Sequence, residues 1–307
     1  MKNALVIHYS QSGQLTGAVK STLRHFENHP ECTVTYTELK PLQPFPFPWT
    51  YSQFWDAFAE TVKGIPCEMQ PLEFDRTVNY DLIILAYQPW FLSPSRPVDS
   101  FLQSAEAKQL LNGKPVVTIL ACRNMWLNAQ ERVKIRLRDI GAQLVGNITY
   151  VDRSSNLVSL ITVLAFALGG EKGRYLGIFP KYGVPQEELN SVAWRYGDIL
   201  MNHLQKGSYN EMQAALVQAG AVKIKTNLMM MEGRGKILFP IYADFILKKG
   251  KANSHQRRTR SKAFGIILPI LILILSPVIT IVSRLMPLLF RTKARKEVEY
   301  FSGVTLR

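Results

Sequence analysis

The sequence is poor in the side chains that build metal and disulfide sites. Its 307 residues include three cysteines and five histidines. The cysteines lie far apart without any ligand spacing and the histidines are scattered, so the sequence predicts no metal site. Two of the cysteines lie in or beside apolar runs, which is typical of buried thiols in a reducing cytosol.

Two common phosphate-binding motifs are also missing. The chain has neither the Gly-Lys-Ser/Thr of a Walker loop nor the Gly-x-Gly-x-x-Gly of a dinucleotide turn. A secretory signal is not apparent either, because Met1-Lys-Asn leads directly into the first apolar run. We therefore expect a cytoplasmic domain.

Acidic side chains are scarce toward the C-terminal end. The chain carries 37 Lys and Arg against 23 Asp and Glu, a net charge of +14. Residues 243–307 hold thirteen of these cations and only three acids, a balance of +10, and they flank the most hydrophobic stretch of the sequence. This arrangement favours an anionic membrane surface as partner and no nucleic acid.

Residues 4–16 combine an apolar run with a hydroxyl-rich turn. Ser10, Ser12, Gly13 and Thr16 follow the run, and a helical pattern comes next. The first turn of a helix leaves its N–H groups unpaired and attracts a phosphate. The loop resembles the phosphate loop of flavodoxins, although Gln14-Leu15 delays its threonine. A helix cap that binds no ligand is the alternative.

Apolar runs and helical patterns alternate over the first 205 residues. The continuous runs are typical of strands buried on both faces, as in parallel sheets. We expect a flavodoxin-like α/β fold, with a doubly wound five-stranded parallel sheet in three layers. Strands are expected at residues 4–8, 33–39, 80–86, 114–121 and 143–151. Helices are expected at residues 15–26, 51–62, 99–111 (capped by Asp99), 157–168 and 186–205, with a further helix ending at 140.

Two more loops follow the ends of predicted central strands, where open parallel sheets bind ligands. The first loop offers Tyr87, Gln88, Pro89, Trp90 and Phe91, whose aromatic rings either stack on a ligand or pack on the sheet. The second loop offers side chains for an anion and a heterocycle edge. These are Arg123, Asn124 and Trp126, with Asn128 as a further candidate or a helix cap. The proline-rich residues 41–49 form either a structural cover or a lid.

Residues 206–307 differ in composition from the rest of the chain. We expect an extension and basic linker at 206–262, with a short helix and strand at 216–225. An uncharged run at 263–283 is long enough to cross a bilayer and predicts a membrane anchor at 263–290, followed by a basic tail at 291–307. Pro269 and Pro277 leave an in-plane or re-entrant anchor as the alternative to a single span. Either anchor places the protein at the cytoplasmic face of the inner membrane.

Several segments together resemble one family. They are His8–Thr16, Pro46–Trp49, Ala86–Ser95, Arg123–Glu131 and Tyr175–Pro180, and they are similar to the flavodoxin-like proteins of bacterial dialkylresorcinol gene clusters. The resemblance covers residues 1–205 and implies an FMN-binding domain. It implies a flavin-dependent oxidoreductase that oxidises a dialkyl-cyclohexanedione to the aromatic resorcinol, alongside a ketosynthase. Proteins of this family are often called dialkylresorcinol condensing enzymes. A condensing enzyme needs a nucleophilic cysteine with a histidine partner, and Cys122 has no evident one.

The resemblance assigns roles to the loop residues. Arg123 would stabilise an enolate, and Tyr87 or His8 would accept a proton. The cofactor would be held by the three loops. These residues are Ser10, Gln11, Ser12, Gly13, Gln14, Thr16, Gln88, Pro89, Trp90, Phe91, Arg123, Asn124 and Trp126. Two other functions stay open: a membrane-tethered NAD(P)H:quinone or flavin reductase, and a non-catalytic electron-transfer or docking protein.

Overall fold

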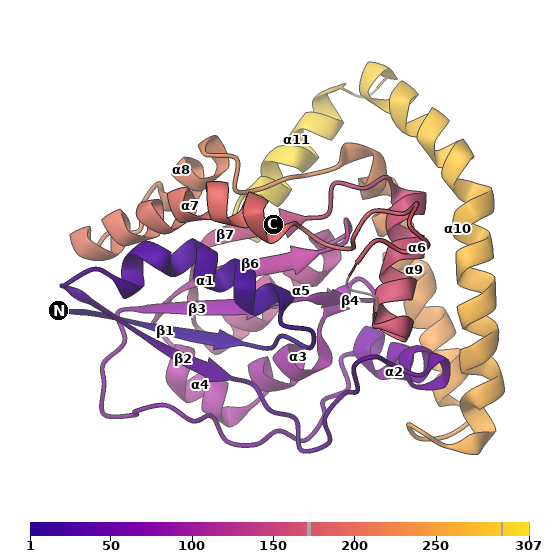
Figure 1. Cartoon of the computed structure of the whole chain (residues 1–307), viewed down its shortest axis with the longest axis horizontal. Helices are drawn as coiled ribbons and strands as arrows, with labels where there is room; N and C mark the ends of the chain where they lie inside the picture. The colour runs from indigo at the N-terminus through magenta and orange to yellow at the C-terminus, as the bar shows by residue number, and fades with distance from the viewer. Residues whose placement is uncertain (171–172, 290, 307) are drawn as a thin grey trace.

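Five parallel strands form the central sheet of the protein. The computed structural model describes residues 1–170, 173–289 and 291–306, without the side chains of 227, 230, 276–289, 291 and 293. The strand order is β2-β1-β3-β6-β7, which is the order 2-1-3-4-5 of flavodoxin-like sheets. The predicted α/β fold is confirmed (Figure 1). The strands are β1 (Lys2–His8), β2 (Cys32–Glu38), β3 (Leu82–Tyr87), β6 (Pro115–Cys122) and β7 (Gln143–Val151).

Helices cover both faces of this sheet. Alternate residues of β1 explain the two layers, because Ala4 and Val6 face one set of helices while Leu5 and Ile7 face the other. The first layer holds α1 (Gln14–Glu27) and α7 (Gln186–Lys206). The second holds α3 (Arg96–Leu102), α4 (Ala105–Leu111) and α5 (Leu127–Ile140). All six residues of β3 are buried, as its continuous apolar run predicted.

Gly197 sets the distance between α1 and α7. A Cβ at this position would lie 1.9 Å from the backbone oxygen of Thr22. The two helices therefore approach more closely than any larger residue would allow. This contact fixes α1, and with it the hydroxyl-rich loop at the start of that helix.

The predicted helix at 99–111 is two helices, and the role predicted for Asp99 is wrong. Ser104 caps the second of them, because its hydroxyl accepts from the N–H of Ala107 at 3.0 Å. Asp99 is instead buried inside α3, where Arg136 Nε lies 3.1 Å from one carboxylate oxygen and Arg132 lies 3.7 Å from the other. A single aspartate before an apolar pair, as in Asp99-Ser-Phe-Leu102, does not distinguish a helix cap from a buried ion pair.

The C-terminal third is more helical than the sequence pattern indicated. It contains α8 (Met212–Gln218), α9 (Thr226–Leu247), α10 (His255–Leu289) and α11 (Arg291–Ser302). The region expected as an extension and linker thus holds a helix of 22 residues. The strand expected near 225 is not formed among the described residues: this segment runs irregularly along β7, where the Thr149 N–H donates to the Ala221 carbonyl at 2.8 Å.

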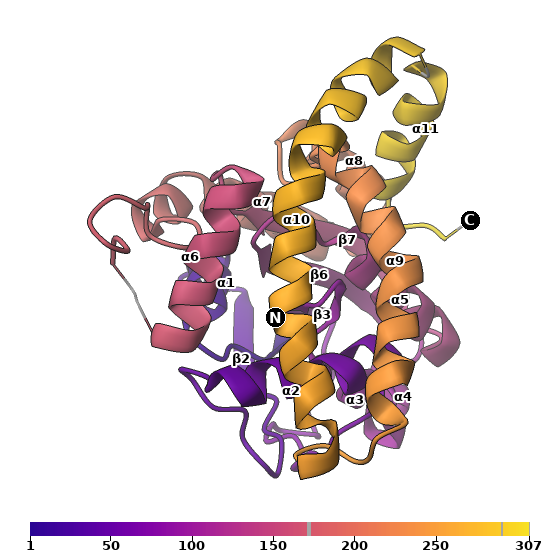
Figure 2. The same cartoon turned by 90° about the vertical axis from the view of Figure 1, so that its right-hand side faces the viewer.

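Helices α9 and α10 lie side by side against α2 (Tyr51–Lys63) (Figure 2). A buried ion-pair cluster fastens the first turns of α10 to α2. Arg257 is fully buried and donates at 2.7 Å to Asp56 and at 2.6 Å to Glu60. The chain then returns to the sheet through α11, where the carbonyl of Ser302 accepts from Gln213 at 2.6 Å.

The predicted membrane anchor coincides with the middle and end of α10. Within the part of the chain that the structure describes, no helix is both long and apolar enough to cross a bilayer. Residue 290 and the side chains of 276–289 lie outside the described residues, and they form much of that predicted segment.

Candidate functional site

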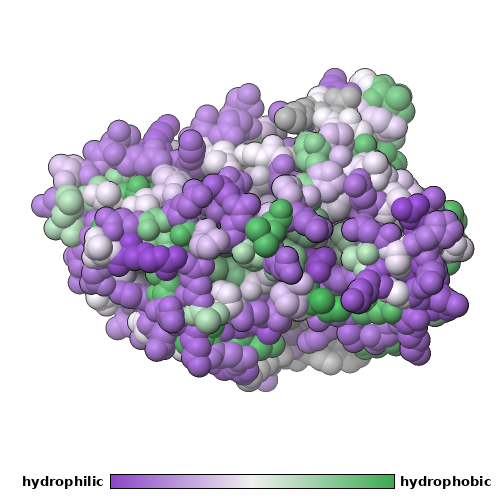
Figure 3. Space-filling model, turned by 90° about the horizontal axis from the view of Figure 1, so that it is seen from below, coloured by the Kyte–Doolittle hydropathy of each residue, from purple (hydrophilic) through white to green (hydrophobic). Residues whose placement is uncertain are grey.

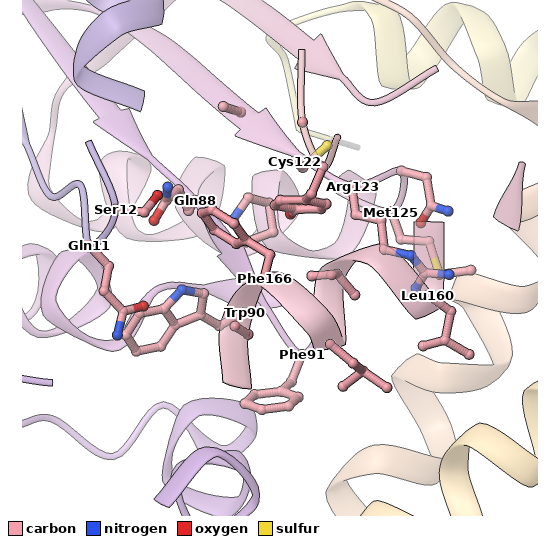
Figure 4. A pocket seen from close by; sticks show the side chains of 18 of the residues that line it. Gln11, Ser12, Gln88, Trp90, Phe91, Cys122, Arg123, Met125, Leu160 and Phe166 are labelled. Carbon is pink, nitrogen blue, oxygen red and sulfur yellow. The ribbon is translucent and has the colours of Figure 1, made fainter. Parts of the chain in front are cut away.

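A cavity opens at the carboxyl edge of the sheet. Its volume is about 310 Å³. The loops after β1, β3 and β6 line one part of it, as their positions at the strand ends predicted. Helices α6 (Asn156–Gly169), α9 and α10 line the other part, and nothing in the sequence pattern indicated this. Figure 4 shows Gln11, Ser12 and Gln88 on one side and Leu160 and Met125 on the other.

The hydroxyl-rich loop forms the polar end of the cavity. Gly13 adopts φ 84° and begins α1 without a side-chain cap, and a Cβ there would meet nothing within 4 Å. The Ser10 hydroxyl accepts from the Thr16 N–H at 3.4 Å, while Ser12 faces the cavity. Ser10 thus engages one N–H of the first turn of α1, while Gly13 supplies no side-chain cap, so the N–H groups beside Ser12 and Gly13 form the arrangement that attracts an anion.

Two glutamine side chains tie this loop to its neighbours. Gln11 donates to the carbonyl of Pro46 at 2.6 Å, and Gln14 donates to that of Tyr182 at 3.2 Å. Both residues line the cavity, so they reach a ligand while holding the loops beside it. The proline-rich segment 41–49 therefore borders the cavity rather than lying elsewhere on the body.

A small hairpin presents the aromatic residues of the second loop. Its strands are β4 (Pro89–Trp90) and β5 (Ser93–Pro94). The Trp90 ring packs edge-to-face with Tyr9, Phe45 and Trp49, at centroid distances of 5.2–5.9 Å. Trp90 is thereby fixed, and it lines the cavity opposite Phe166 of α6 (Figure 4).

The turn of this hairpin is strained. Phe91 and Leu92 have φ values of 48° and 62°, in the left-handed region that normally favours Gly or Asn. Phe91 packs on Phe54 at 5.2 Å and on Phe58 at 5.3 Å, which holds the turn in place. Such strain persists only where surrounding contacts enforce it, and it commonly accompanies functional sites. The sequence did not indicate this hairpin, because Phe91 and Leu92 are bulky residues that are unusual in a two-residue turn.

Arg123 is the cationic side chain of the cavity. Its Nε donates to Ser159 Oγ at 2.8 Å, and its Nη2 donates to Asn156 Oδ1 at 2.7 Å. Burial lowers the pKa of Arg123 to about 10, so the guanidinium stays charged at neutral pH. Asn124 also lines the cavity and donates to the same Asn156 oxygen at 2.9 Å. Two side chains of α6 thus orient the third loop.

Ser10, Gly13 and Thr16 of the first loop are not among the cavity-lining residues, and three further predicted site residues also lie outside the lining. Tyr87 is fully buried and donates to Gln130 at 2.6 Å, and burial raises its pKa. Trp126 is buried and donates to the Lys223 carbonyl at 3.2 Å. His8 donates to the Thr37 carbonyl at 3.1 Å, and burial lowers its pKa. Each of them has a structural partner, and the structure does not bring them together with Arg123.

The cavity has no acidic side chain among the lining residues that the structure describes. Three other groups that ionise line it, namely Cys122, Tyr150 and Tyr182, and burial raises the pKa of each, so all three are neutral at pH 7. Arg123 therefore gives the cavity a net positive charge. Across the described ranges, groups of three or more metal-ligating side chains are not found.

Comparisons with known proteins give matches in structure alone. No family model and no curated protein matches the sequence. The structure is similar to a flavoprotein in complex with FMN from Lactobacillus acidophilus, with 18% identity over 48% of this chain and 93% of that one, at a TM-score of 0.39. A flavodoxin-type WrbA-like protein from Agrobacterium tumefaciens matches with 11% identity, 68% and 100% coverage, and a TM-score of 0.36. Oxidised flavodoxin 1 from Bacillus cereus matches with 16% identity, 50% and 88% coverage, and a TM-score of 0.30.

Proposed function

We propose that this chain is an FMN-dependent oxidoreductase that acts on a ring carrying hydrocarbon tails. The observation behind the proposal is a single cavity with a phosphate-type loop at one end, an arginine and fixed aromatic rings in the middle, and an apolar end between helices. As the resemblance implies, we propose a dialkyl-cyclohexanedione as substrate and the aromatic resorcinol as product. A ketosynthase would supply that ring.

The polar end fits a flavin monophosphate. The uncapped start of α1 and the Ser12 hydroxyl offer donors to a phosphate, and the open space at Gly13 allows close approach of the backbone. The absence of carboxylates from the described lining removes the charge repulsion that would oppose an anion. These residues would hold the phosphate, with Gln11 and Gln14 at its sides.

The middle of the cavity fits a flat heterocycle. Trp90 and Phe166 offer ring surfaces, and Gln88 and Asn124 offer amide groups that both donate and accept. When bound there, the flavin supplies a two-electron acceptor for a hydride from the substrate ring. The protein's part is to fix the two rings in contact and to exclude water.

Arg123 would bind the oxygen on which negative charge develops. Ser159 and Asn156 hold its guanidinium by Nε and Nη2, so its Nη1 group is positioned without rearrangement. A cyclic 1,3-dione is acidic, so its ring proton leaves readily once a cation stabilises the enolate, and the reaction needs charge stabilisation more than a strong protein base. This matches a cavity whose described lining includes a cation and no carboxylate.

The apolar end fits hydrocarbon tails. It is lined by Leu160, Val163 and Leu164 of α6, by Met231 and Phe239 of α9, and by Leu268 and Ile272 of α10. Burying a methylene group contributes about 0.8 kcal/mol, so a tail of several carbons would contribute much of the binding free energy. A tailed quinone would use the same contacts, which is why a quinone reductase is the second candidate.

FMN binding to the purified full chain tests the first step. We expect the protein to quench FMN fluorescence with one site per chain. Ser12→Asp should weaken FMN binding at least 100-fold by placing a carboxylate at the phosphate, while riboflavin binding changes little. Ser191→Asp, an equally simple change at an exposed position of α7, should bind FMN as the parent does.

Turnover separates the two candidate reactions. We expect a dialkyl-cyclohexane-1,3-dione to be converted to a product with resorcinol absorbance, and Arg123→Met to lower kcat more than it changes KM. Reduction of a tailed quinone by NADPH, without action on the dione, would instead establish the reductase. A protein that takes up no FMN under any of these conditions would rule out both enzymes and leave a docking role.

A further inference from the structure

We propose that helices α9 and α10 carry a face that docks on the surface of an anionic lipid bilayer, with both helices lying in the plane of that surface. The proposal concerns the outside of the molecule and does not depend on the flavin chemistry. It gives the expected membrane association a defined surface made of described residues.

An apolar face covers α9 and α10. Eleven of the twenty large hydrophobic side chains that are exposed in the described residues lie between positions 237 and 275. Their exposed fractions run from 41% to 66%. We call this set the α9–α10 face; it consists of Ile237, Leu238, Ile241, Phe245, Ile266, Ile267, Ile270, Leu271, Leu273, Ile274 and Leu275.

The arrangement of these side chains is that of an interfacial helix pair. On α9 they follow at spacings of one, three and four residues, which places them on one side of the helix. The ring of Phe264 on α10 packs on Tyr242 of α9 at 4.5 Å, so the two helices are held next to each other (Figure 2). By contrast, the view in Figure 3 is mostly hydrophilic, with apolar atoms in small separate patches. A concentrated apolar face of this kind marks an interaction surface.

Charge identifies the partner as an anionic surface. Exposed cations are interspersed in the sequence of α9, α10 and the turn between them, namely Arg234, Lys236, Lys248, Lys249, Lys251, Arg258 and Lys262. Between residues 233 and 275 the sequence has one acid, Asp244, which pairs with Lys63 at 2.9 Å. Each cation near an anionic leaflet contributes about 1 kcal/mol, so the cluster favours acidic lipids strongly over neutral ones.

The fastening of both ends of α10 favours docking in the plane. Its first turns are held to α2 by Arg257, and α11 packs back on the α/β body, where Lys134 donates to the Thr305 carbonyl at 3.2 Å. Both flanks of α10 therefore lie on the same side of any bilayer that the face touches. Apolar side chains on such helices sink about 5–10 Å into the headgroup boundary.

The α9–α10 face and one side of the cavity are formed by the same two helices. Leu268 and Ile272 line the cavity, while their neighbours Ile267, Ile270 and Leu271 are exposed on the docking face. The same holds for α9. Its residues Met231, Gly235 and Phe239 line the cavity, and the neighbouring Ile237 and Leu238 are exposed. A tailed molecule dissolved in the bilayer would thus be separated from the cavity by one layer of helices.

Vesicle flotation of the full chain tests the docking. We expect the protein to float with phosphatidylcholine vesicles containing 30% phosphatidylglycerol, and to bind pure phosphatidylcholine at least tenfold more weakly. Raising the salt from 0.1 to 0.5 M should lower binding to the anionic vesicles severalfold, because screening weakens the charge contribution.

Matched variants locate the surface. The triple change Lys248→Glu/Lys249→Glu/Lys251→Glu and the triple change Ile241→Gln/Ile270→Gln/Ile274→Gln should each lower the affinity for anionic vesicles at least tenfold. The control, Leu42→Gln/Ile65→Gln/Ile135→Gln, changes three exposed apolar residues elsewhere and should bind as the parent does. Far-UV circular dichroism and urea unfolding confirm that each variant is folded.

Three binding results would overturn the proposal. One is equal binding to neutral and anionic vesicles without salt dependence, and another is undiminished binding by both triple variants. The third is a stable dimer, broken by the isoleucine changes, together with no vesicle binding, because the face would then be covered by a second copy.

A bimane label on Ile270→Cys tests the depth to which the face enters the bilayer. We expect stronger quenching by shallow than by deep lipid quenchers, and the reverse would exclude docking in the plane.

Discussion

At the scale of single residues, Glu232 is a buried carboxyl group that joins α9 to the third loop. The Asn128 N–H donates to its carboxylate at 2.7 Å, and the N–H groups of Trp126 and Leu127 also point at it. Burial raises the pKa of Glu232 from 4.5 to about 7, against the effect of these hydrogen bonds. The group therefore acts as a cap on α5 supplied by a distant part of the chain.

Glu232 should make the stability of the protein depend on pH. The unfolded chain loses this proton near pH 4.5, whereas the folded chain keeps it up to about pH 7. Between these values the folded state binds more protons, so the free energy of unfolding falls as the pH rises, by about 3 kcal/mol in total. Glu232→Gln stays neutral and should remove this loss, as measured by urea unfolding at pH 5 and pH 8.

The control for this measurement is Glu31→Gln, because Glu31 is exposed and outside the α5–α9 contact. It should leave the difference between pH 5 and pH 8 as in the parent. A Glu232→Gln protein with an unchanged pH dependence would show that the carboxyl group does not titrate in this range.

The candidate site illustrates what a sequence reveals about individual residues. Ser12, Trp90, Arg123 and Asn124 reach the cavity because a residue just after a parallel strand lies at the ligand edge of the sheet. His8, Tyr87 and Trp126 occupy equally suggestive positions but point into the protein. Whether such a side chain points to the cavity or into the protein depends on the residue at which the strand ends. That residue cannot be identified from one sequence.

At the scale of elements, Arg257 fastens α10 to α2. Hydrogen bonds and ion pairs with Glu60 and Asp56 raise its pKa despite the cost of burial. Removing one member of such a buried cluster leaves the others uncompensated, at a cost of about 3–5 kcal/mol. Arg257→Met should therefore lower the free energy of unfolding by this amount and speed hydrogen exchange at the start of α10.

A compensated variant distinguishes charge from packing. Arg257→Met combined with Asp56→Asn and Glu60→Gln removes the whole charged cluster, and it should recover most of the stability lost in the single variant. If the triple variant is as unstable as the single one, the side-chain volume of Arg257 rather than its charge holds α10 in place.

The elements of residues 1–205 were largely predictable, and those beyond were not. Buried parallel strands and their turns leave continuous apolar runs and clustered Gly or Pro, which local patterns reveal. Helix α9 has little separation of polar and apolar sides, because one side packs on α2, part lines the cavity and another part is exposed. Its sequence therefore lacked the amphipathic period by which helices are recognised.

At the scale of the whole molecule, the α9–α10 face should make the solution behaviour of the protein depend on an apolar environment. In buffer without detergent we expect concentration-dependent self-association, because apolar surfaces of this extent associate in water. A mild detergent above its critical micelle concentration should return a single monomeric species in sedimentation velocity. Ile241→Gln/Ile270→Gln/Ile274→Gln should sediment as a monomer even without detergent, whereas the control triple at residues 42, 65 and 135 should behave as the parent.

The wall shared by the cavity and the α9–α10 face has a consequence for kinetics. Leu268 and Ile272 touch the cavity from a helix whose other side would rest on lipid. A substrate that enters from the bilayer reaches the protein by diffusion within the membrane. The turnover rate should therefore follow the mole fraction of substrate in the membrane and not its bulk concentration. Diluting the substrate with inert phospholipid, at constant bulk concentration, should then slow the docked protein.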